Sequence, residues 1–324
     1  FYAFSEVADL RNFSQHPFQT LYKYFSTLCK IISVIVRNKI SIIHCNHYEW
    51  SIYANPVGLI LGKPVLIHLK DSYSLQPKLS RFLMKFYPHA TYIAVSKYVK
   101  NLFIKNYQID TKKTVVIYDA INMSSFNPLP SVEMKKKYRK RNKKITMISR
   151  VAPERNIELF IDIAALLIEK YPDITFHHYG YMPSKIESRY FLTLKRRVAL
   201  LKLNNNFYFH QFIQNPHTVG KYLRESFLSI ITSANYALPN IAIESLSCGT
   251  PVIAYKNGGT LEVIKSAISL VEVNSPILYM NHIEKLLHDE SLYMNLVFCG
   301  IHDSKLFTPF LQSEKLISLY DSLL

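Results

Sequence analysis

Short apolar segments alternate with helical stripes along this sequence, and the alternation limits the folds that the chain can adopt. The segment Lys144–Val151 is short and apolar, as a buried strand is, whereas Ile157–Glu169 repeats apolar residues at helical spacing. Another strand-like segment, Ile174–Gly180, follows that helix. Parallel strands need a long connection between them, and a helix usually supplies it. The alternation therefore predicts parallel β-sheets with helices on both faces.

The alternation forms two series, one before and one after a polar stretch near residues 127–143. In the first series we expect helices at 21–39, 48–61, 81–87 and 97–105, and strands at 41–45, 62–69, 91–96 and 114–121. In the second we expect helices at 157–169, 187–201, 218–225, 241–247 and 313–323, and strands at 144–151, 174–180, 206–212, 227–233 and 251–255. Pro56 should lie at the start of its helix or at a kink, and Ser96 should cap the helix after it.

The predicted fold is α/β, with two doubly wound Rossmann-like domains facing each other across a cleft. The expected boundaries are a first domain at 1–127, a basic linker at 128–143, a second domain at 144–310 and a last helix at 311–324. Ligands of such sheets bind beyond the carboxyl ends of the strands, where the strand order reverses. Candidate functional residues should therefore follow strands.

Composition excludes several other classes of protein. Of the 324 residues, 49% are hydrophobic and 19% charged, so the chain is globular rather than disordered. No run approaches the ~18 apolar residues of a membrane-spanning helix, and no basic-then-apolar leader begins the chain. The four cysteines lack CxxC spacing, which disfavours a zinc site and a disulfide framework and predicts reduced thiols in a cytoplasmic protein.

Positive charge is concentrated in the first half of the chain. The net charge is +16, of which residues 1–130 carry +9, residues 131–150 carry +8 and the remainder −1. This asymmetry predicts an anionic partner for the first half. The densest run, Met134–Lys144, either contacts phosphate head groups or is a solvated connector. No nucleic-acid-binding motif is present, so we expect no nucleic-acid partner.

Two arginines lie where an anion could bind. In the segment SRVAPERNIELFIDIAALL, Arg150 ends a predicted strand and Arg155 comes just before a helix. A helix N-terminus favours negative charge, and two fixed cations beside it suit a diphosphate. The alternative is that both are surface arginines near a helix start.

A second motif runs from Ser233 to Ile264 as strand, loop, helix, turn, strand, loop and helix. Pro239 and Asn240 begin the helix that carries Glu244. Backbone N–H groups and one carboxylate would then face the predicted cleft, where Glu244 could accept both hydroxyls of a ribose. The alternative is that Glu244 is only a favourable charge near the start of its helix.

In combination, the motifs resemble the nucleotide-sugar-binding domain of glycosyltransferase family 4, a retaining family with the GT-B fold. The likeness rests on SRVAPERNIELFIDIA, ITFHHYG, NFYFHQF, IITSANYALPNIAIESLSCGTPVIAY and NGGTLEVI in that order. It covers residues ~90–324 and continues weakly back to ~40. The resemblance implies that the first domain binds the acceptor, the second binds the donor, and the last helix crosses back to the first.

The resemblance also implies roles for individual residues. Arg150 and Arg155 match the family's Arg and Lys that bind the donor diphosphate, and Glu244 matches the glutamate that holds the ribose. The implied donor-binding set is Arg150, Arg155, Leu238, Pro239, Asn240, Ile241 and Glu244, and the implied catalytic set is Arg150, Arg155, Tyr236 and Lys70. Gly258, Gly259 and Glu262 match a Gly-Gly-x-x-Glu segment that we interpret as structural.

The sequence departs from the family pattern at three places. Tyr236 stands where the first of two glutamates is expected, so a carboxylate near the donor sugar is replaced by a phenol. The family's His-Asp pair appears as Lys70-Asp71, with His68 two residues earlier; Lys70 or His68 could face the sugar, or His68 could be a structural residue of a buried strand. The family's opening strand and Gly-rich loop do not precede Ser5, from which we expect roughly 50 residues to be absent.

The resemblance predicts a retaining glycosyltransferase that moves a sugar from a nucleotide diphosphate donor to an acceptor hydroxyl. The acceptor would be a glycan or lipid-linked carrier, in the synthesis of cell-surface polysaccharide or lipopolysaccharide. We expect no metal or other cofactor, and a cytoplasmic protein that is peripheral at the inner face of the cell membrane. The alternative is a non-catalytic partner subunit that kept the fold.

Overall fold

A computed structural model describes residues 17–71, 90–180 and 185–324 of the chain. The chain divides into two compact units, and each is described by itself. The first contains the described residues up to Ile117 together with 314–324, and the second runs from Tyr118 to Ser313. Both are built on parallel sheets, as the alternation predicts, while the predicted domain boundaries and linker stay a prediction. None of the helices in the described ranges is both long and apolar enough to span a bilayer.

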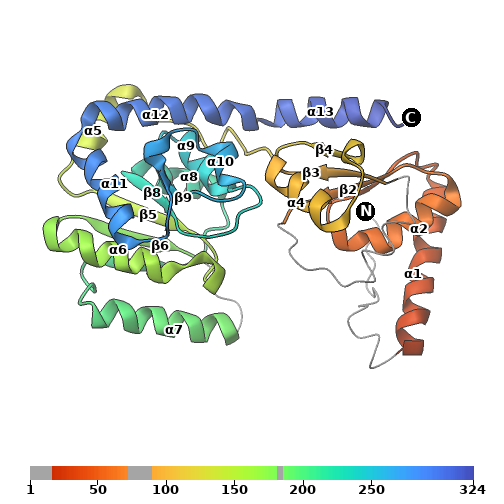
Figure 1. The fold of residues 1–324 in the computed structure, drawn as a ribbon, viewed down its shortest axis with the longest axis horizontal. Coiled ribbons are helices and arrows are strands. Elements are labelled where there is room, and N and C mark those ends of the chain that lie inside the picture. The colour runs from red at the N-terminus through yellow and green to blue at the C-terminus, as the bar shows by residue number, and fades with distance from the viewer. Residues whose placement is uncertain (1–16, 72–89, 181–184) are drawn as a thin grey trace. The chain divides into compact units, whose positions relative to one another are not determined.

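The first unit is a parallel four-stranded sheet with helices packed on it (Figure 1). Its strands lie in chain order: β1 (Ile43–Cys45), β2 (Val65–Leu69), β3 (Ala90–Ala94) and β4 (Thr114–Val116). Its helices are α1 (Pro17–Arg37), α2 (Ser51–Leu61) and α4 (Lys97–Tyr107), with 3₁₀ turns at Tyr48–Trp50 and Thr111–Lys113. Ser96 caps α4 as predicted, because its Oγ accepts from the Val99 N–H at 3.1 Å. The helix expected at 81–87 lies outside the described residues.

The two faces of β2 pack against different parts of the chain. α2 approaches the face that carries Val65 so closely that a Cβ on Gly58 would clash with the Val65 side chain. The alternate residue Leu66 points to the opposite face, because successive side chains of a strand alternate. There the last residues of the chain, including Leu316 and Leu319 of α13 (Pro309–Asp321), cover the sheet.

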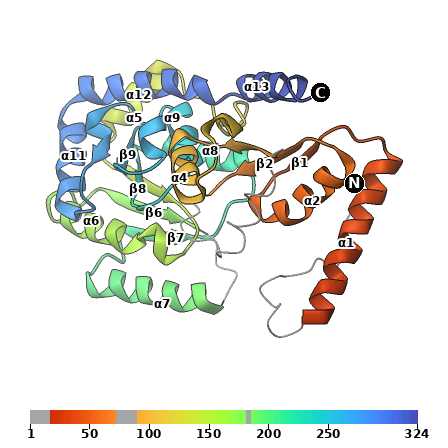
Figure 2. The ribbon, with the colours of Figure 1, turned by 45° about the vertical axis from the view of Figure 1, so that its right-hand side comes forward.

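Pro56 lies inside α2, neither at its start nor beyond its end, and a neighbouring helix compensates for it. A proline has no N–H, so the carbonyl of Ile52, four residues earlier, loses its helical donor. The hydroxyl of Tyr24 on α1 donates to that carbonyl at 2.9 Å. α1 runs beside α2 (Figure 2), and Tyr24 packs with Tyr53 and Val57 there. The contact between the helices therefore supplies the donor that the proline removes.

Replacing Tyr24 with Phe should weaken α2 locally. The ring stays, but the Ile52 carbonyl loses its donor, at a cost of about 1 kcal/mol. Amide hydrogen exchange on the full chain should show faster exchange across Ser51–Leu61 in this variant.

Tyr22→Phe is the matched control, because Tyr22 lies on the same helix and is 75% exposed. Equal exchange rates in Tyr24→Phe and Tyr22→Phe would show that the hydroxyl does not support α2.

The second unit is a parallel six-stranded sheet whose strand order reverses. The order is β10-β9-β8-β5-β6-β7, so the chain runs outward from β5 in one direction and then, from β8, in the other. The strands are β5 (Lys144–Ile148), β6 (Thr175–Tyr179), β7 (Phe207–His210), β8 (Leu228–Ile231), β9 (Val252–Tyr255) and β10 (Leu270–Val271). The helices are α5 (Ser131–Arg139), α6 (Ile157–Lys170), α7 (Lys185–Leu200), α8 (Pro216–Glu225), α9 (Asn240–Ser247), α10 (Thr260–Val263), α11 (Pro276–His288) and α12 (Glu290–Ser304).

Helices cover this second sheet from both sides, with α6 and α7 on one face and α9 and α12 on the other (Figure 1). On the α6 face, Phe160 packs edge-on against Phe176 of β6 and Phe207 of β7, and all three are buried. Apolar side chains spaced three and four residues apart on α6 supply the rest of that layer. The packed layers of sheet and helices fix the positions at which the loops after the strands begin.

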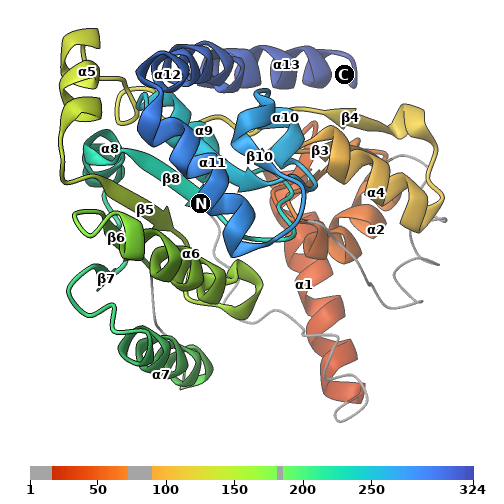
Figure 3. The same cartoon turned by 60° about the vertical axis from the view of Figure 1, so that its left-hand side comes forward.

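Most of the basic run 134–144 is tied into the second unit. Its first half forms α5, which packs beside α12 (Figure 3). Lys137 is buried and donates to the Gly249 carbonyl, and burial lowers its pKa to about 8. Arg139 pairs with Glu290, and Arg141 pairs with Asp173. Several cations of the run are therefore bonded within the second unit, although Arg139 and Arg141 stay largely exposed in their ion pairs.

Candidate functional site

The loops after β5 and β8 meet where the strand order of the second sheet reverses. β5 and β8 pair directly in parallel, with Ile145 beside Leu228 and Thr146 beside Ser229. Parallel pairing places both carboxyl ends at the same edge of the sheet. The loop after β5 carries Arg150 and Arg155, and the loop after β8 carries Tyr236.

Arg150 is exposed and already has a partner. Its Nη2 lies 2.5 Å from Oε1 of Glu154, and the two side chains are 57% and 55% exposed. An exposed ion pair of this kind contributes about 0–1 kcal/mol. An anionic ligand could displace Glu154 at little cost, so the predicted role of Arg150 fits its surroundings and stays a prediction.

Arg155 ends the 3₁₀ turn Pro153–Arg155 just before α6 begins. Its carbonyl accepts a 2.7 Å hydrogen bond from the hydroxyl of Thr232, the first residue after β8. Its guanidinium lies over the ring of Tyr236, with Cζ 4.6 Å from the ring centroid. The structure thus brings together two residues that the sequence proposes separately.

The loop that carries Tyr236 is fixed by Gly259. The N–H of Gly259 donates to the Tyr236 carbonyl at 2.9 Å. A Cβ on Gly259 would lie 2.0 Å from the Ala237 carbonyl oxygen, so only glycine allows this approach. This contact gives the Gly-Gly-x-x-Glu segment a structural function, and Glu262 of the same segment accepts from the Tyr118 hydroxyl at 2.9 Å.

The sequence predicts free backbone N–H groups in the first turn of α9, but several of them are already bonded. Leu238 and Pro239 are buried, and the N–H groups of Asn240 and Ala242 donate to their carbonyls at 3.0 and 2.9 Å. The Ile243 N–H also turns back to Pro239. These amides are satisfied within the turn, because Pro239 starts the helix without a side-chain cap. A ligand would therefore meet fewer free N–H groups here than the sequence predicts.

Glu244 is a partly buried carboxylate one turn further along α9. Burial raises its pKa to about 7, and no ion pair or hydrogen bond to its carboxylate is formed within the described part of the chain. An unpaired carboxylate in such surroundings is costly, and hydroxyl donors from a ligand would relieve the cost. The predicted ribose-binding role of Glu244 fits these surroundings and stays a prediction.

Lys70 belongs to the first unit, where it directly follows β2. It is partly exposed, and its neighbour His68 is 5% exposed with no hydrogen-bond partner among described residues for either ring nitrogen. Burial, with His44 and Lys70 nearby, lowers the pKa of His68 to about 4, so this imidazole is neutral. The predicted role of Lys70 stays a prediction.

Sequence reasoning missed a cavity of about 510 Å³ beyond the carboxyl ends of β6 and β7. Aromatic and polar side chains line it together, among them Phe191, Phe209, Gln211, Phe212 and Gln214. His178 also lines it and bonds to the Ser149 hydroxyl at 3.1 Å. Gln214, two residues after the strand predicted at 206–212, was the available signal, since ligands bind at such strand ends.

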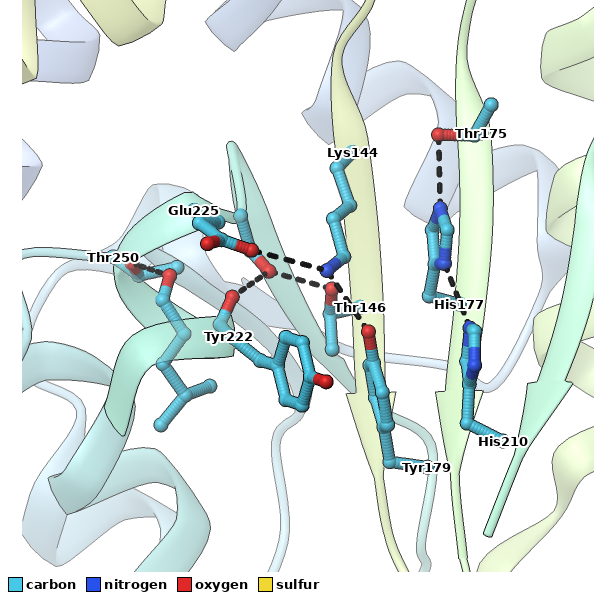
Figure 4. A network of polar contacts seen from close by, with 11 residues as sticks. Lys144, Thr146, Thr175, His177, Tyr179, His210, Tyr222, Glu225 and Thr250 are labelled. Carbon is cyan, nitrogen blue, oxygen red and sulfur yellow. Dashed lines mark hydrogen bonds and ion pairs between the residues drawn. The ribbon is translucent and has the colours of Figure 1, made fainter. Parts of the chain in front are cut away.

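A polar network on β5, β6 and β7 is a second feature that the sequence does not show. Lys144 donates to the Tyr179 hydroxyl at 2.9 Å and lies 4.0 Å from Glu225, while His177 and His210 share a 2.9 Å hydrogen bond (Figure 4). The network holds Lys144, the last lysine of the basic run, inside the second unit. Across the described ranges, no group of three or more His, Cys, Asp or Glu side chains is arranged to hold a metal ion.

Comparison with known proteins identifies the class. Residues 132–298 match the family described as Glycosyl transferases group 1, and residues 3–125 match Glycosyltransferase Family 4. The first match covers just over half of the chain. The chain therefore belongs to the group 1 glycosyltransferase family, and both units have the parallel α/β architecture of the GT-B fold.

Individual relatives are distant. The chain is 24% identical over 245 residues to the putative glycosyltransferase YtcC of Bacillus subtilis, covering 71% of this chain and 60% of that protein. It is 22% identical over 294 residues to an Escherichia coli UDP-Gal:alpha-D-GlcNAc-diphosphoundecaprenol alpha-1,3-galactosyltransferase, covering 84% of this chain and 73% of that protein.

Among solved structures, Alr3699/HepE of Anabaena in complex with UDP is similar. The TM-score is 0.80 at 19% identity, covering 91% of this chain and 82% of that one. A glycosyltransferase of Rickettsia africae matches with the same TM-score at 21% identity, covering 93% and 82%. These likenesses establish the fold.

The raised pKa of Glu244 predicts that a neutral substitute stabilises the protein only at high pH. The folded-state pKa of about 7 lies above the ordinary carboxyl value, so the folded chain holds this proton more tightly than the unfolded chain. Stability is therefore lost as pH rises from about 4.5 through 7, by about 3 kcal/mol, since one pKa unit corresponds to about 1.4 kcal/mol. Glu244→Gln should raise the melting temperature at pH 8 and change it little at pH 5.

Glu169→Gln, an exposed position on α6, controls for the loss of one charge. An equal gain for Glu244→Gln at both pH values would contradict the buried, unpaired carboxylate.

Proposed function

We propose that the chain carries the catalytic units of a retaining glycosyltransferase, which moves a sugar from a nucleotide diphosphate sugar to an acceptor hydroxyl. The observation that carries the proposal is the contact of Arg155 with Tyr236 between the two loops at the strand reversal of a group 1 family domain, with Glu244 on the helix α9 that follows the second loop. Two structures of one solved relative support a nucleotide-sugar donor, because the Anabaena protein was crystallised with UDP and with UDP-glucose.

The proposed chemistry is stabilisation of the leaving group. Negative charge grows on the diphosphate as the glycosidic bond breaks, and fixed cations that meet this charge lower the barrier. Arg155, and Arg150 after release from Glu154, are the cations proposed for that task, so the reaction would need no metal. Glu244 would accept the ribose hydroxyls, and the cavity beside Phe209 and Phe212 would take the nucleobase.

The proposed acceptor is a lipid-linked glycan at the inner face of the cell membrane, within cell-surface polysaccharide synthesis. The named E. coli relative acts on a diphosphoundecaprenol-linked sugar. Residues 1–130 carry a net charge of +9, which suits an anionic lipid or lipid diphosphate. The cations of the run 134–144 are mostly paired or buried, so the charge relevant to a membrane is that of the first unit.

One observation favours a second candidate, a non-catalytic partner subunit. Tyr236 occupies the position at which the family resemblance expects a carboxylate beside the donor sugar. Such a subunit would bind nucleotide sugars without transferring or hydrolysing them.

A donor panel tests the enzymatic proposal. The full chain should transfer sugar from at least one of the UDP-, GDP- or ADP-sugars to a polyprenyl-diphosphate glycan, faster in anionic than in neutral vesicles. Arg150→Ala and Arg155→Ala should each weaken binding of the matching nucleoside diphosphate by ~1.5–3 kcal/mol, as expected for a charge-assisted hydrogen bond.

Nucleotide binding with neither transfer nor slow donor hydrolysis would support the partner subunit instead. Unchanged affinity in both arginine variants would contradict the donor site itself.

A further inference from the structure

The contact between Arg155 and Tyr236 joins the two loops at the strand reversal. The guanidinium carbon lies 4.6 Å from the centre of the Tyr236 ring, and both side chains are partly buried. A guanidinium over the face of an aromatic ring is attracted by the ring's negative face, and the attraction strengthens with burial. The residues are far apart in sequence, so the fold alone brings them together.

Both members of the pair stand on fixed backbone. Arg155 is held through its own carbonyl by Thr232 and through its N–H by the Ala152 carbonyl, at 2.7 and 2.9 Å. Tyr236 is held through its carbonyl by the Gly259 N–H at 2.9 Å. The backbones of both residues are therefore fixed by hydrogen bonds, and this places the two side chains in contact.

A contact with an aromatic ring does not bond the N–H donors of the guanidinium to a strong acceptor. The guanidinium carbon lies over the face of the Tyr236 ring, and that face offers no strong acceptor to the five N–H donors of the arginine. The Nε of Arg155 is buried and has no hydrogen-bond partner among the residues that the structure describes. A carboxylate at position 236 would bind these donors and neutralise the charge, which an aromatic ring does not do.

Arg150 is held in a different way. Its guanidinium is paired with Glu154, so a ligand must first displace a carboxylate from it. Arg155 meets no carboxylate in the described residues, and its charge is available from the start. Of the two arginines, Arg155 is thus the one prepared for an incoming diphosphate.

We propose that Tyr236 is a positioning residue whose ring holds Arg155 with its donors free for the diphosphate of the donor. On this account the residues at 155 and 236 belong together: Arg155 stands where the resemblance has a lysine, and Tyr236 where it has a glutamate. An arginine can stack on a ring while it binds a phosphate, and a lysine lacks the planar group for this. The inference rests on the proposed donor site and replaces the expected direct action of Tyr236 on the sugar.

Calorimetry on the full chain tests the inference with UDP as probe, and with GDP and ADP measured alongside. Tyr236→Phe keeps the ring and should bind the preferred nucleotide within twofold of the unaltered chain. Tyr236→Leu should bind about 5–20-fold more weakly, the range expected when a half-buried cation–π contact is lost. Tyr236→Glu should bind more weakly still, since the new carboxylate would pair with Arg155 and repel the diphosphate.

A double variant shows whether Tyr236 acts through Arg155. Arg155→Ala combined with Tyr236→Leu should bind no more weakly than Arg155→Ala alone, because the ring then has nothing to hold. Tyr208→Leu, an exposed tyrosine of β7 in the same unit, is the matched control and should leave the affinity unchanged.

The outcomes separate this inference from the proposed function. If Arg155→Ala weakens binding but Tyr236→Leu does not, or if the two losses multiply in the double variant, the positioning role is wrong and the donor site stands. If Tyr236→Leu fails to fold, Tyr236→Glu decides, and an affinity equal to that of the unaltered chain overturns the role. If no nucleoside diphosphate binds the unaltered chain, the proposed function itself fails.

Discussion

The direct parallel pairing of β5 with β8 is the constraint on which the candidate site depends. These strands are joined through two further strands and three helices, so their pairing closes a long stretch of chain. It brings the loop after β5 next to Thr232, whose hydroxyl binds the Arg155 carbonyl. A slip of one residue would turn every side chain of a strand to the other face, so the buried layers on both sides fix the register. The positions of Arg155 and Tyr236 follow from that register.

The candidate site differs from the basic run in whether its charged groups already have partners, more than in how many charges it carries. The run is the densest positive segment of the chain, yet Arg139 and Arg141 are paired with carboxylates and Lys137 is buried against a carbonyl. At the strand reversal the opposite holds: Arg155 has a buried donor without a partner among described residues, and the Glu244 carboxylate has a raised pKa. A cationic donor and a carboxylate that both lack partners lower the stability of the folded unit. A ligand with phosphates could bond to the arginine, and its hydroxyls could bond to the carboxylate.

Features that depend on neighbouring residues can be predicted from the sequence, whereas features that depend on contacts between distant segments cannot. The strands β5 to β9 and helices α6 to α9 of the second unit, the Ser96 cap and the placement of Arg155 before a helix follow from apolar spacing and capping chemistry. The helices α5, α10, α11 and α12 and the strand β10 were not predicted. The position of Pro56 inside α2 could not be predicted, because the hydrogen-bond donor that replaces its missing N–H comes from Tyr24 on another helix. The Arg155–Tyr236 stack is non-local in the same way, and so is the burial of Lys137 in a run that looks solvated.

Hydrogen exchange of the full chain with and without saturating UDP tests most directly whether the strand reversal of the second unit is the nucleotide site. We predict that UDP slows exchange in the separate segments 149–157 and 234–247 and at the proposed nucleobase cavity, 209–214, while α5 and the first unit's α2 exchange as before. Slower exchange confined to α5 and the basic run, or none in either segment at a UDP concentration that calorimetry shows to be saturating, would contradict the account.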